Sequence, residues 1–77
     1  MVVVSADGVP GPPRLAVIAG RKVGTAVARN RAKRRLREAA ARSPMKSGRD
    51  YIVIADPAVN EVPFHQLIAW VTEALEA

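Results

Sequence analysis

Basic side chains crowd one short segment of this 77-residue chain, between residues 29 and 37. The segment reads RNRAKRRLR and contains six Lys or Arg residues but no acid. The planar guanidinium of arginine can hold a phosphate through two hydrogen bonds, and it can also stack on a base. Structured RNA presents phosphates, 2′-hydroxyls and splayed bases. A basic helix could also enter the major groove of DNA, but the preponderance of arginine favours RNA.

Charge is sorted strongly along the chain. All twelve Lys and Arg residues lie between Arg14 and Arg49, and this window contains a single acid, Glu38. The net charge of the whole chain is +5. Sorting of this kind predicts that one face binds a polyanion. The alternative is a solvated basic helix that only keeps the chain in solution, a task usually met by interspersed charges of both signs.

Several kinds of chemistry are excluded or disfavoured. The chain has no cysteine, which excludes disulfides and cysteine zinc sites and suits the cytoplasm, where we expect the protein to work. The single histidine, His65, has no neighbours at metal-ligand spacing. Asp50 and Asp56 flank an apolar run and could hold Mg²⁺, but turn and capping roles are favoured. No catalytic triad or glycine-rich phosphate loop is present, so we expect no catalytic residue in the protein.

Five elements must position these residues, in the order β-β-α-β-α. Strands are predicted at 2–4, 14–19 and 50–55, a helix at 26–42 with Thr25 as its N-cap, and a last helix from Phe64 to about Leu75. The strand at 50–55 is unbroken in apolar character, which predicts burial on both faces. This order indicates an α+β fold, with one sheet covered by helices.

The predicted helix at 26–42 has two different sides. At about 100° per residue, a narrow apolar stripe is formed by Ala28, Ala32, Leu36 and Ala39. The opposite side is predicted to carry Asn30 and six basic residues, namely Arg31, Lys33, Arg34, Arg35, Arg37 and Arg42, while Arg29 lies at the edge of the stripe. Tyr51 and Trp70 could stack on bases, but packing is the favoured role for both.

Three segments together resemble the bacterial ribonuclease P protein family. Residues 29–38 resemble the arginine-asparagine-arginine signature of that family. Residues 21–27, RKVGTAV, resemble its lead-in of two basic residues, an apolar residue, Gly and Ala-Val. Residues 50–55 resemble the strand that follows. The resemblance extends from about Arg14 to Leu75.

The resemblance implies a function in tRNA processing. In this family the protein assists a catalytic RNA, which uses Mg²⁺ ions to remove 5′ leaders from precursor tRNAs. The implied partners are therefore ribonuclease P RNA and precursor tRNA, and the implied Mg²⁺ is used by the RNA and not bound firmly by the protein. The implied fold is a two-layer sandwich of the ribosomal-protein-S5-domain-2-like type, with a left-handed β-α-β crossover. The implied RNA-binding residues are Arg21, Lys22, Arg29, Asn30, Arg31, Lys33, Arg34 and Arg37.

The chain also departs from the family pattern. Family members usually begin with some tens of residues more, including a helix whose aromatic residues line the cleft for the leader. Residues 2–4 would form the strand after that helix, and Asp56 stands where the family tends to have a basic residue. We therefore expect binding to the RNA subunit, weaker contact with the leader, and self-association through bare sheet surface. The alternative function is that of a general structured-RNA-binding protein of ribosomal type.

Overall fold

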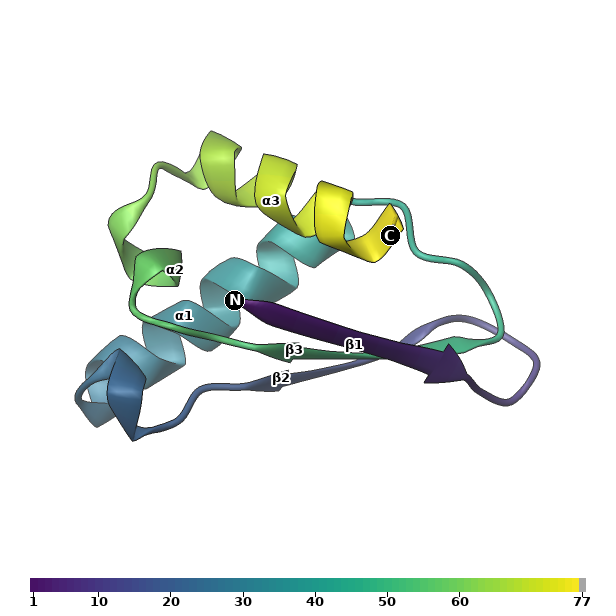
Figure 1. The fold of residues 1–77 in the computed structure, drawn as a ribbon, viewed down its shortest axis with the longest axis horizontal. Coiled ribbons are helices and arrows are strands. Elements are labelled where there is room, and N and C mark those ends of the chain that lie inside the picture. Colours follow the sequence, from purple (N-terminus) through teal and green to yellow (C-terminus); the bar gives the residue numbers. More distant parts are fainter. Residues whose placement is uncertain (77) are drawn as a thin grey trace.

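The computed structural model describes residues 1–76, in which one three-stranded sheet is covered by helices (Figure 1). Its elements are β1 (Val2–Asp7), β2 (Arg14–Ile18), the 3₁₀ helix η1 (Arg21–Val23), α1 (Ala26–Ala41), β3 (Arg49–Ile54), α2 (Ala58–Glu61) and α3 (Phe64–Glu76). The α+β class and the predicted order of strands and long helices are confirmed. The sequence prediction lacked the two short helices and made β1 too short.

The last strand along the chain lies in the middle of the sheet, in the order β1-β3-β2. It runs antiparallel to β1, with Val4 opposite Ile52, and parallel to β2, with Ala16 opposite the same residue. Parallel neighbours cannot be joined by a tight hairpin, so α1 makes the crossover from β2 to β3. Figure 1 shows α1 and α3 on the same side of the sheet, which makes the fold two-layered.

The core lies between these two layers. Val17, Tyr51 and Val53 point inward from alternate strand positions, and they are buried together with Leu36 of α1 and Leu67 of α3. The apolar stripe predicted on α1 is confirmed, because Ala32, Leu36 and Ala39 are buried and Ala28 packs partly against the core. Small alanine side chains let the helix backbone approach the neighbouring elements closely.

The other face of the sheet carries no helix among the described residues. The prediction that β3 is buried on both faces was therefore wrong, since Ile52 is 40% exposed and Ile54 is 38% exposed. Large apolar side chains from the flanking strands are also exposed on this face, namely Val2, Val4 and Ile18. An apolar run in a strand predicts burial, but it does not specify that helices cover both faces of the sheet.

A capped turn sets the start of α1. The Thr25 hydroxyl oxygen accepts a hydrogen bond from the Ala28 backbone N–H at 3.2 Å, which confirms the predicted N-cap. Gly24 has a φ of 128°, a backbone conformation that side chains with a Cβ rarely adopt. Just before it, the backbone N–H of Val23 donates to the Gly20 carbonyl at 3.1 Å and closes η1. The turn thus places Arg21 and Lys22 next to the first turn of α1.

The short helix α2 was missed because four residues are too few to show a helical period. Asp56 Oδ1 accepts a hydrogen bond from the Ala58 backbone N–H at 3.1 Å, so the turn role favoured for this acid is confirmed. Asn60 then donates from Nδ2 to the Ala28 carbonyl at 2.9 Å, which fastens α2 to the first turn of α1. The tertiary contact, rather than local propensity, stabilises this helix.

An arginine–carboxylate pair joins β2 and β3 at the end where β1 leads into its loop. Arg14 donates from Nε and Nη2 to the two carboxylate oxygens of Asp50, at 2.7 and 2.6 Å. Gly8 lies against this pair, because a Cβ at that position would stand 2.6 Å from Asp50 Oδ1. The hydrogen bond from Arg14, together with its charge, lowers the pKa of Asp50 below its ordinary value.

We expect the Arg14–Asp50 pair to make stability depend on acidity. A carboxyl group whose pKa is lowered by folding stabilises the native state above its unfolded pKa of about 4, and the contribution is lost as the pH falls below that value. The midpoint temperature of thermal unfolding should be measured between pH 6 and 2.5. As the pH falls, it should decrease more steeply for the unchanged chain than for Asp50→Asn. Equal slopes would mean that the pair contributes nothing.

Candidate nucleic-acid interface

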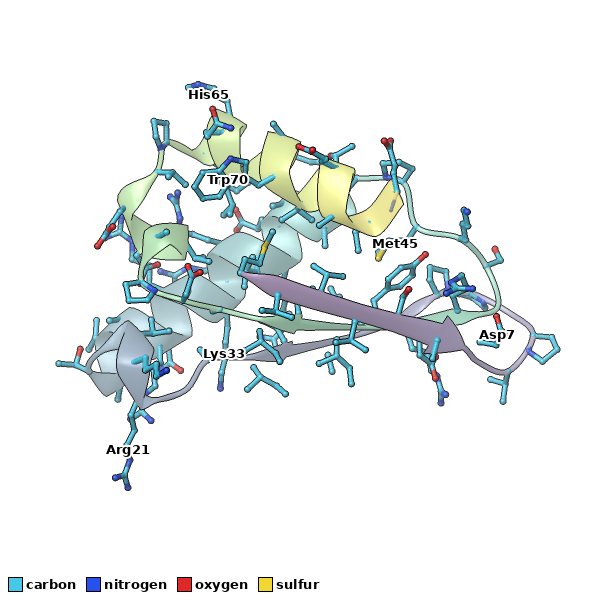
Figure 2. The ribbon with its side chains drawn as sticks, in the orientation of Figure 1. Asp7, Arg21, Lys33, Met45, His65 and Trp70 are labelled. Atoms are coloured by element: carbon cyan, nitrogen blue, oxygen red, sulfur yellow. The ribbon has the colours of Figure 1, made fainter. Side chains whose placement is uncertain are left out.

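The side of α1 that faces away from the core presents the central part of the basic segment. Asn30, Arg31, Arg34 and Arg37 are all exposed. Arg29 and Lys33 are half-buried and belong to one flank of this side. Figure 2 shows Lys33 pointing away from α3, toward the side of the molecule where the sheet is bare. The basic side chains therefore form a continuous strip along the helix rather than a single cluster.

Arg21 and Lys22 extend this strip beyond the start of α1. Both are exposed on η1, which packs against α1. Arg21 points in the same direction as Lys33 in Figure 2. The eight residues implied by the family resemblance thus lie on two adjoining elements. We refer to these eight residues, Arg21, Lys22, Arg29, Asn30, Arg31, Lys33, Arg34 and Arg37, as the basic strip.

The seven cationic side chains of the basic strip make no side-chain hydrogen bond or ion pair within residues 1–76. Each guanidinium or ammonium group repels its neighbours on α1, and Glu38 is the one acid on the same helix. This repulsion has a free-energy cost that binding of a polyanion would relieve. The basic strip therefore offers phosphate groups several cationic side chains that have no partner within residues 1–76.

Four other arginines form hydrogen bonds or ion pairs with other groups of the protein. Arg14 pairs with Asp50, and Arg49 pairs with Asp7 at 3.0 Å. Arg35 donates to the backbone carbonyls of Val59 in α2 and of Val62 just after it, and Arg42 donates to the Glu38 carbonyl at 3.0 Å. The guanidinium carbons of Arg35 and Arg42 lie 5.8 and 5.3 Å from the centre of the Phe64 ring.

The predicted position of Arg35 on the open side of the helix was therefore wrong, since this side chain is half-buried against the α2–α3 corner, whereas Arg42 is exposed as predicted. Both lie on the flank of α1 that meets α3, where Phe64 stands between them. A helical wheel places a residue around one helix, but it does not show which second helix will pack there. Neither residue belonged to the predicted RNA-binding set. The set therefore stays unchanged, and it is still a prediction.

The two aromatic residues considered for base stacking contribute to packing. Tyr51 is only 2% exposed, and its hydroxyl oxygen accepts a hydrogen bond from the Lys46 backbone N–H at 3.1 Å. Trp70 is half-buried against the core. His65 is exposed on the first turn of α3 (Figure 2). Across residues 1–76, no group of three or more His, Cys, Asp or Glu side chains could hold a metal ion.

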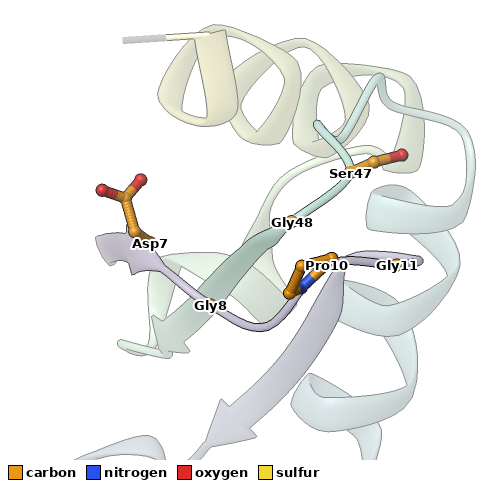
Figure 3. Close-up of a pocket in the computed structure, with 6 residues that line it drawn as sticks. All are labelled: Asp7, Gly8, Pro10, Gly11, Ser47 and Gly48. Atoms are coloured by element: carbon orange, nitrogen blue, oxygen red, sulfur yellow. The ribbon is translucent and has the colours of Figure 1, made fainter.

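Two hollows lie away from the basic strip. The larger, of about 460 Å³, is lined by Asp7, Gly8, Pro10, Gly11, Ser47 and Gly48 where two loops meet (Figure 3). Its lining has no basic residue, and the Gly8 and Gly48 backbone N–H groups are used in hydrogen bonds to carbonyls. The smaller, of about 250 Å³, borders the Arg14–Asp50 pair. Neither offers unpaired cationic groups for a phosphate.

Comparison with known proteins identifies the family. The model of the family described as Ribonuclease P matches residues 1–77. This chain belongs to the ribonuclease P family. The family resemblance predicted from residues 21–27, 29–38 and 50–55 together is therefore confirmed. In the described part of the chain, no helix is long and apolar enough to cross a membrane.

Relatives within the ribonuclease P family match most of the chain. It is 46% identical over 67 residues to the ribonuclease P protein component of Symbiobacterium thermophilum, and 40% identical over 77 residues to that of an Arthrobacter species. These alignments cover 84% and 97% of the chain but only 58% and 54% of the relatives. The chain therefore spans little more than half the length of these proteins.

Solved structures of the family have the same fold. The ribonuclease P protein of Thermotoga maritima superposes with a TM-score of 0.84 at 28% identity, over 96% of this chain and 73% of that one. The Staphylococcus aureus protein superposes with a TM-score of 0.71 at 26% identity, over 96% and 72% of the two chains. The similarity includes all three strands and both long helices, since it covers nearly the whole chain.

Proposed function

We propose that this chain acts as a protein subunit of ribonuclease P and binds the catalytic RNA through its basic strip. One observation carries the proposal: seven cationic side chains stand together on α1 and η1 without a protein partner among the described residues. Phosphates of a folded RNA would neutralise them and release condensed counterions, which favours binding. Membership of the ribonuclease P family supports this choice of RNA.

In this proposal the protein carries no catalytic residue. The RNA subunit cleaves the precursor tRNA with Mg²⁺, and the protein lowers the Mg²⁺ concentration that the reaction requires by adding its own positive charge. The net charge of +5 underestimates this contribution, because most of the acids follow residue 49 in the sequence and none lies within the basic segment. The proposed site of action is the cytoplasm.

Reconstitution tests the proposal directly. Cleavage of a leader-bearing precursor tRNA by a bacterial ribonuclease P RNA should be measured at low Mg²⁺ with and without the protein. We expect stimulation, together with binding to that RNA at physiological salt. Absence of both would refute the assignment.

Competition separates this proposal from general binding of structured RNA. Unrelated folded RNA of similar length should displace the protein from ribonuclease P RNA only when present in large excess. Equal competition would favour the general RNA-binding function. A chain that binds the RNA but does not stimulate cleavage of leader-bearing substrate would be deficient in leader contact alone.

The bare face of the sheet is proposed as a weak contact between two copies of the chain. Three strands at about 4.8 Å spacing and about 3.3 Å per residue give a face of roughly 14 by 18 Å. This area is far below the roughly 800 Å² per partner of a stable complex. The centre of the face is apolar, with Ile52 between Val4 and Ala16. Any dimer should therefore form only at high concentration.

Sedimentation equilibrium tests this weak contact. We expect monomers at low concentration and a growing dimer fraction at roughly 100 μM and above. Ile52→Lys places a charge in the middle of the face and should abolish the dimer. Val27→Lys is the matched control, because Val27 is apolar and 79% exposed but lies on α1. Equal loss in both variants would argue against this face.

A further inference from the structure

Arg35 makes a set of contacts that no other residue of the basic segment shares. Its Nε donates to the Val59 carbonyl at 3.0 Å, and its Nη2 donates to the Val62 carbonyl. Its guanidinium also stands over the Phe64 ring. These three partners belong to α2, the connection after it and the first residue of α3. One side chain from the middle of α1 therefore contacts every part of the corner between α2 and α3, in addition to the hydrogen bond from Asn60 to the Ala28 carbonyl.

The geometry leaves little of Arg35 for an RNA ligand. The Nε–Nη2 edge of the planar guanidinium group already donates to two carbonyls, and the guanidinium carbon lies 5.8 Å from the centre of the Phe64 ring. The side chain is half-buried, whereas that of Arg34 beside it is exposed. Carbonyl oxygens near the end of a helix carry partial negative charge, so a cation there is favourable. Breaking these bonds to reach a phosphate would leave two carbonyls unpaired.

The corner held by Arg35 begins the acidic part of the molecule. No Lys or Arg follows Arg49 in the sequence, while Asp56, Glu61, Glu73 and Glu76 all do. Glu61 is exposed on α2, the helix that packs on α1. Arg35 thus joins to α1 a corner that carries the exposed carboxylate of Glu61, whereas the carboxylate of Asp56 pairs with the N-terminal ammonium group.

We propose that Arg35 is a positioning residue and not an RNA ligand. It fixes the α2–α3 corner, with the exposed Glu61, against α1, so that a bound RNA strand is kept to the side of the helix that carries Lys33 and continues to Arg21. The part of this inference that concerns RNA rests on the proposed function. The part that concerns the corner does not, and it can be measured without RNA.

Distance measurement between two spin labels tests the position of the corner. The chain has no cysteine, so Ala41→Cys and Glu61→Cys introduce the only two labelling sites, on the exposed end of α1 and on α2. We expect a narrow distance distribution in this background and a broad one after Arg35→Leu. Arg35→Lys should also broaden it, because an ammonium cannot bridge the two carbonyls as the planar fork does. Arg34→Leu is the matched control and should leave it narrow.

RNA binding at several salt concentrations completes the test. Arg34→Leu should reduce the slope of log affinity against log salt by roughly 0.7–0.9, the value of one phosphate contact. Arg35→Leu should leave this slope unchanged and lower the thermal midpoint by roughly 5–15 °C. An unchanged distance distribution, combined with a reduced slope in Arg35→Leu, would overturn the proposal and make Arg35 an RNA ligand.

The positioning role of Arg35 can still be tested if Arg35→Leu does not fold or if the unchanged chain does not bind RNA. If Arg35→Leu does not fold, Arg35→Lys and Phe64→Leu supply the same distance comparison. Narrow distance distributions in both variants would refute the positioning role of Arg35. If the unchanged chain binds no ribonuclease P RNA, the proposed function fails. The spin-label distances would still decide whether Arg35 holds the corner.

Discussion

Replacing Arg31 and Arg34 together by alanine is expected to weaken binding to ribonuclease P RNA by roughly 10- to 100-fold at physiological salt, through the loss of two charge-assisted contacts. Both side chains are exposed on α1 and have no protein partner within residues 1–76, so their removal should not disturb the fold. The dependence of log affinity on log salt should become flatter by roughly 1.5, which corresponds to two phosphate contacts. Filter binding or fluorescence anisotropy at four or more salt concentrations measures both quantities.

Lys46→Ala is the control for this double variant. Lys46 is exposed in the loop after α1, and it lies outside the basic strip. Its removal lowers the net charge without touching the proposed interface, so the slope should change much less than in the double variant. A double variant with an unchanged slope and an unchanged thermal midpoint would remove this surface of α1 from the binding model.

Replacing Leu36 by alanine is expected to destabilise the protein by about 2–4 kcal/mol. The side chain is 1% exposed and is among the largest that are fully buried, so alanine would leave a cavity between α1 and the neighbouring elements. A domain of this size has a total stability of only about 3–5 kcal/mol. The variant should therefore be largely unfolded at physiological temperature, and urea denaturation followed by circular dichroism would measure the loss.

Val27→Ala on the same helix is the control for Leu36→Ala. Val27 is also branched and apolar, but it is 79% exposed, and its truncation should change stability by no more than about 0.5 kcal/mol. Addition of ribonuclease P RNA should partly restore folding of Leu36→Ala, because a ligand that binds only the native state stabilises it. A Leu36→Ala protein as stable as the Val27→Ala protein would contradict the burial of this side chain.

Much of the candidate site could be predicted from the amino-acid sequence, because its signals are local. Asn30 and its basic neighbours on α1 are contiguous in sequence, and a helical period sorts them to one side without reference to the rest of the fold. The cap at Thr25 was also predictable, since a capping hydroxyl acts on a backbone N–H only three residues away. The segment RKVGTAV and the basic segment after it carried enough pattern to indicate the family.

What the sequence alone determined is the order of the main elements, the apolar stripe of α1 and the segment on which positive charge gathers. All three depend on residues close together in the chain. Tertiary structure alone decided that Arg35 faces the α2–α3 corner while Arg34 stays exposed, that α2 forms, and that Ile52 and Ile54 lie on a bare face. These features arise from contacts between residues more than twenty positions apart. Which distant residues come into contact depends on the packing of the whole chain, and a local hydrophobic period in the sequence does not contain this information.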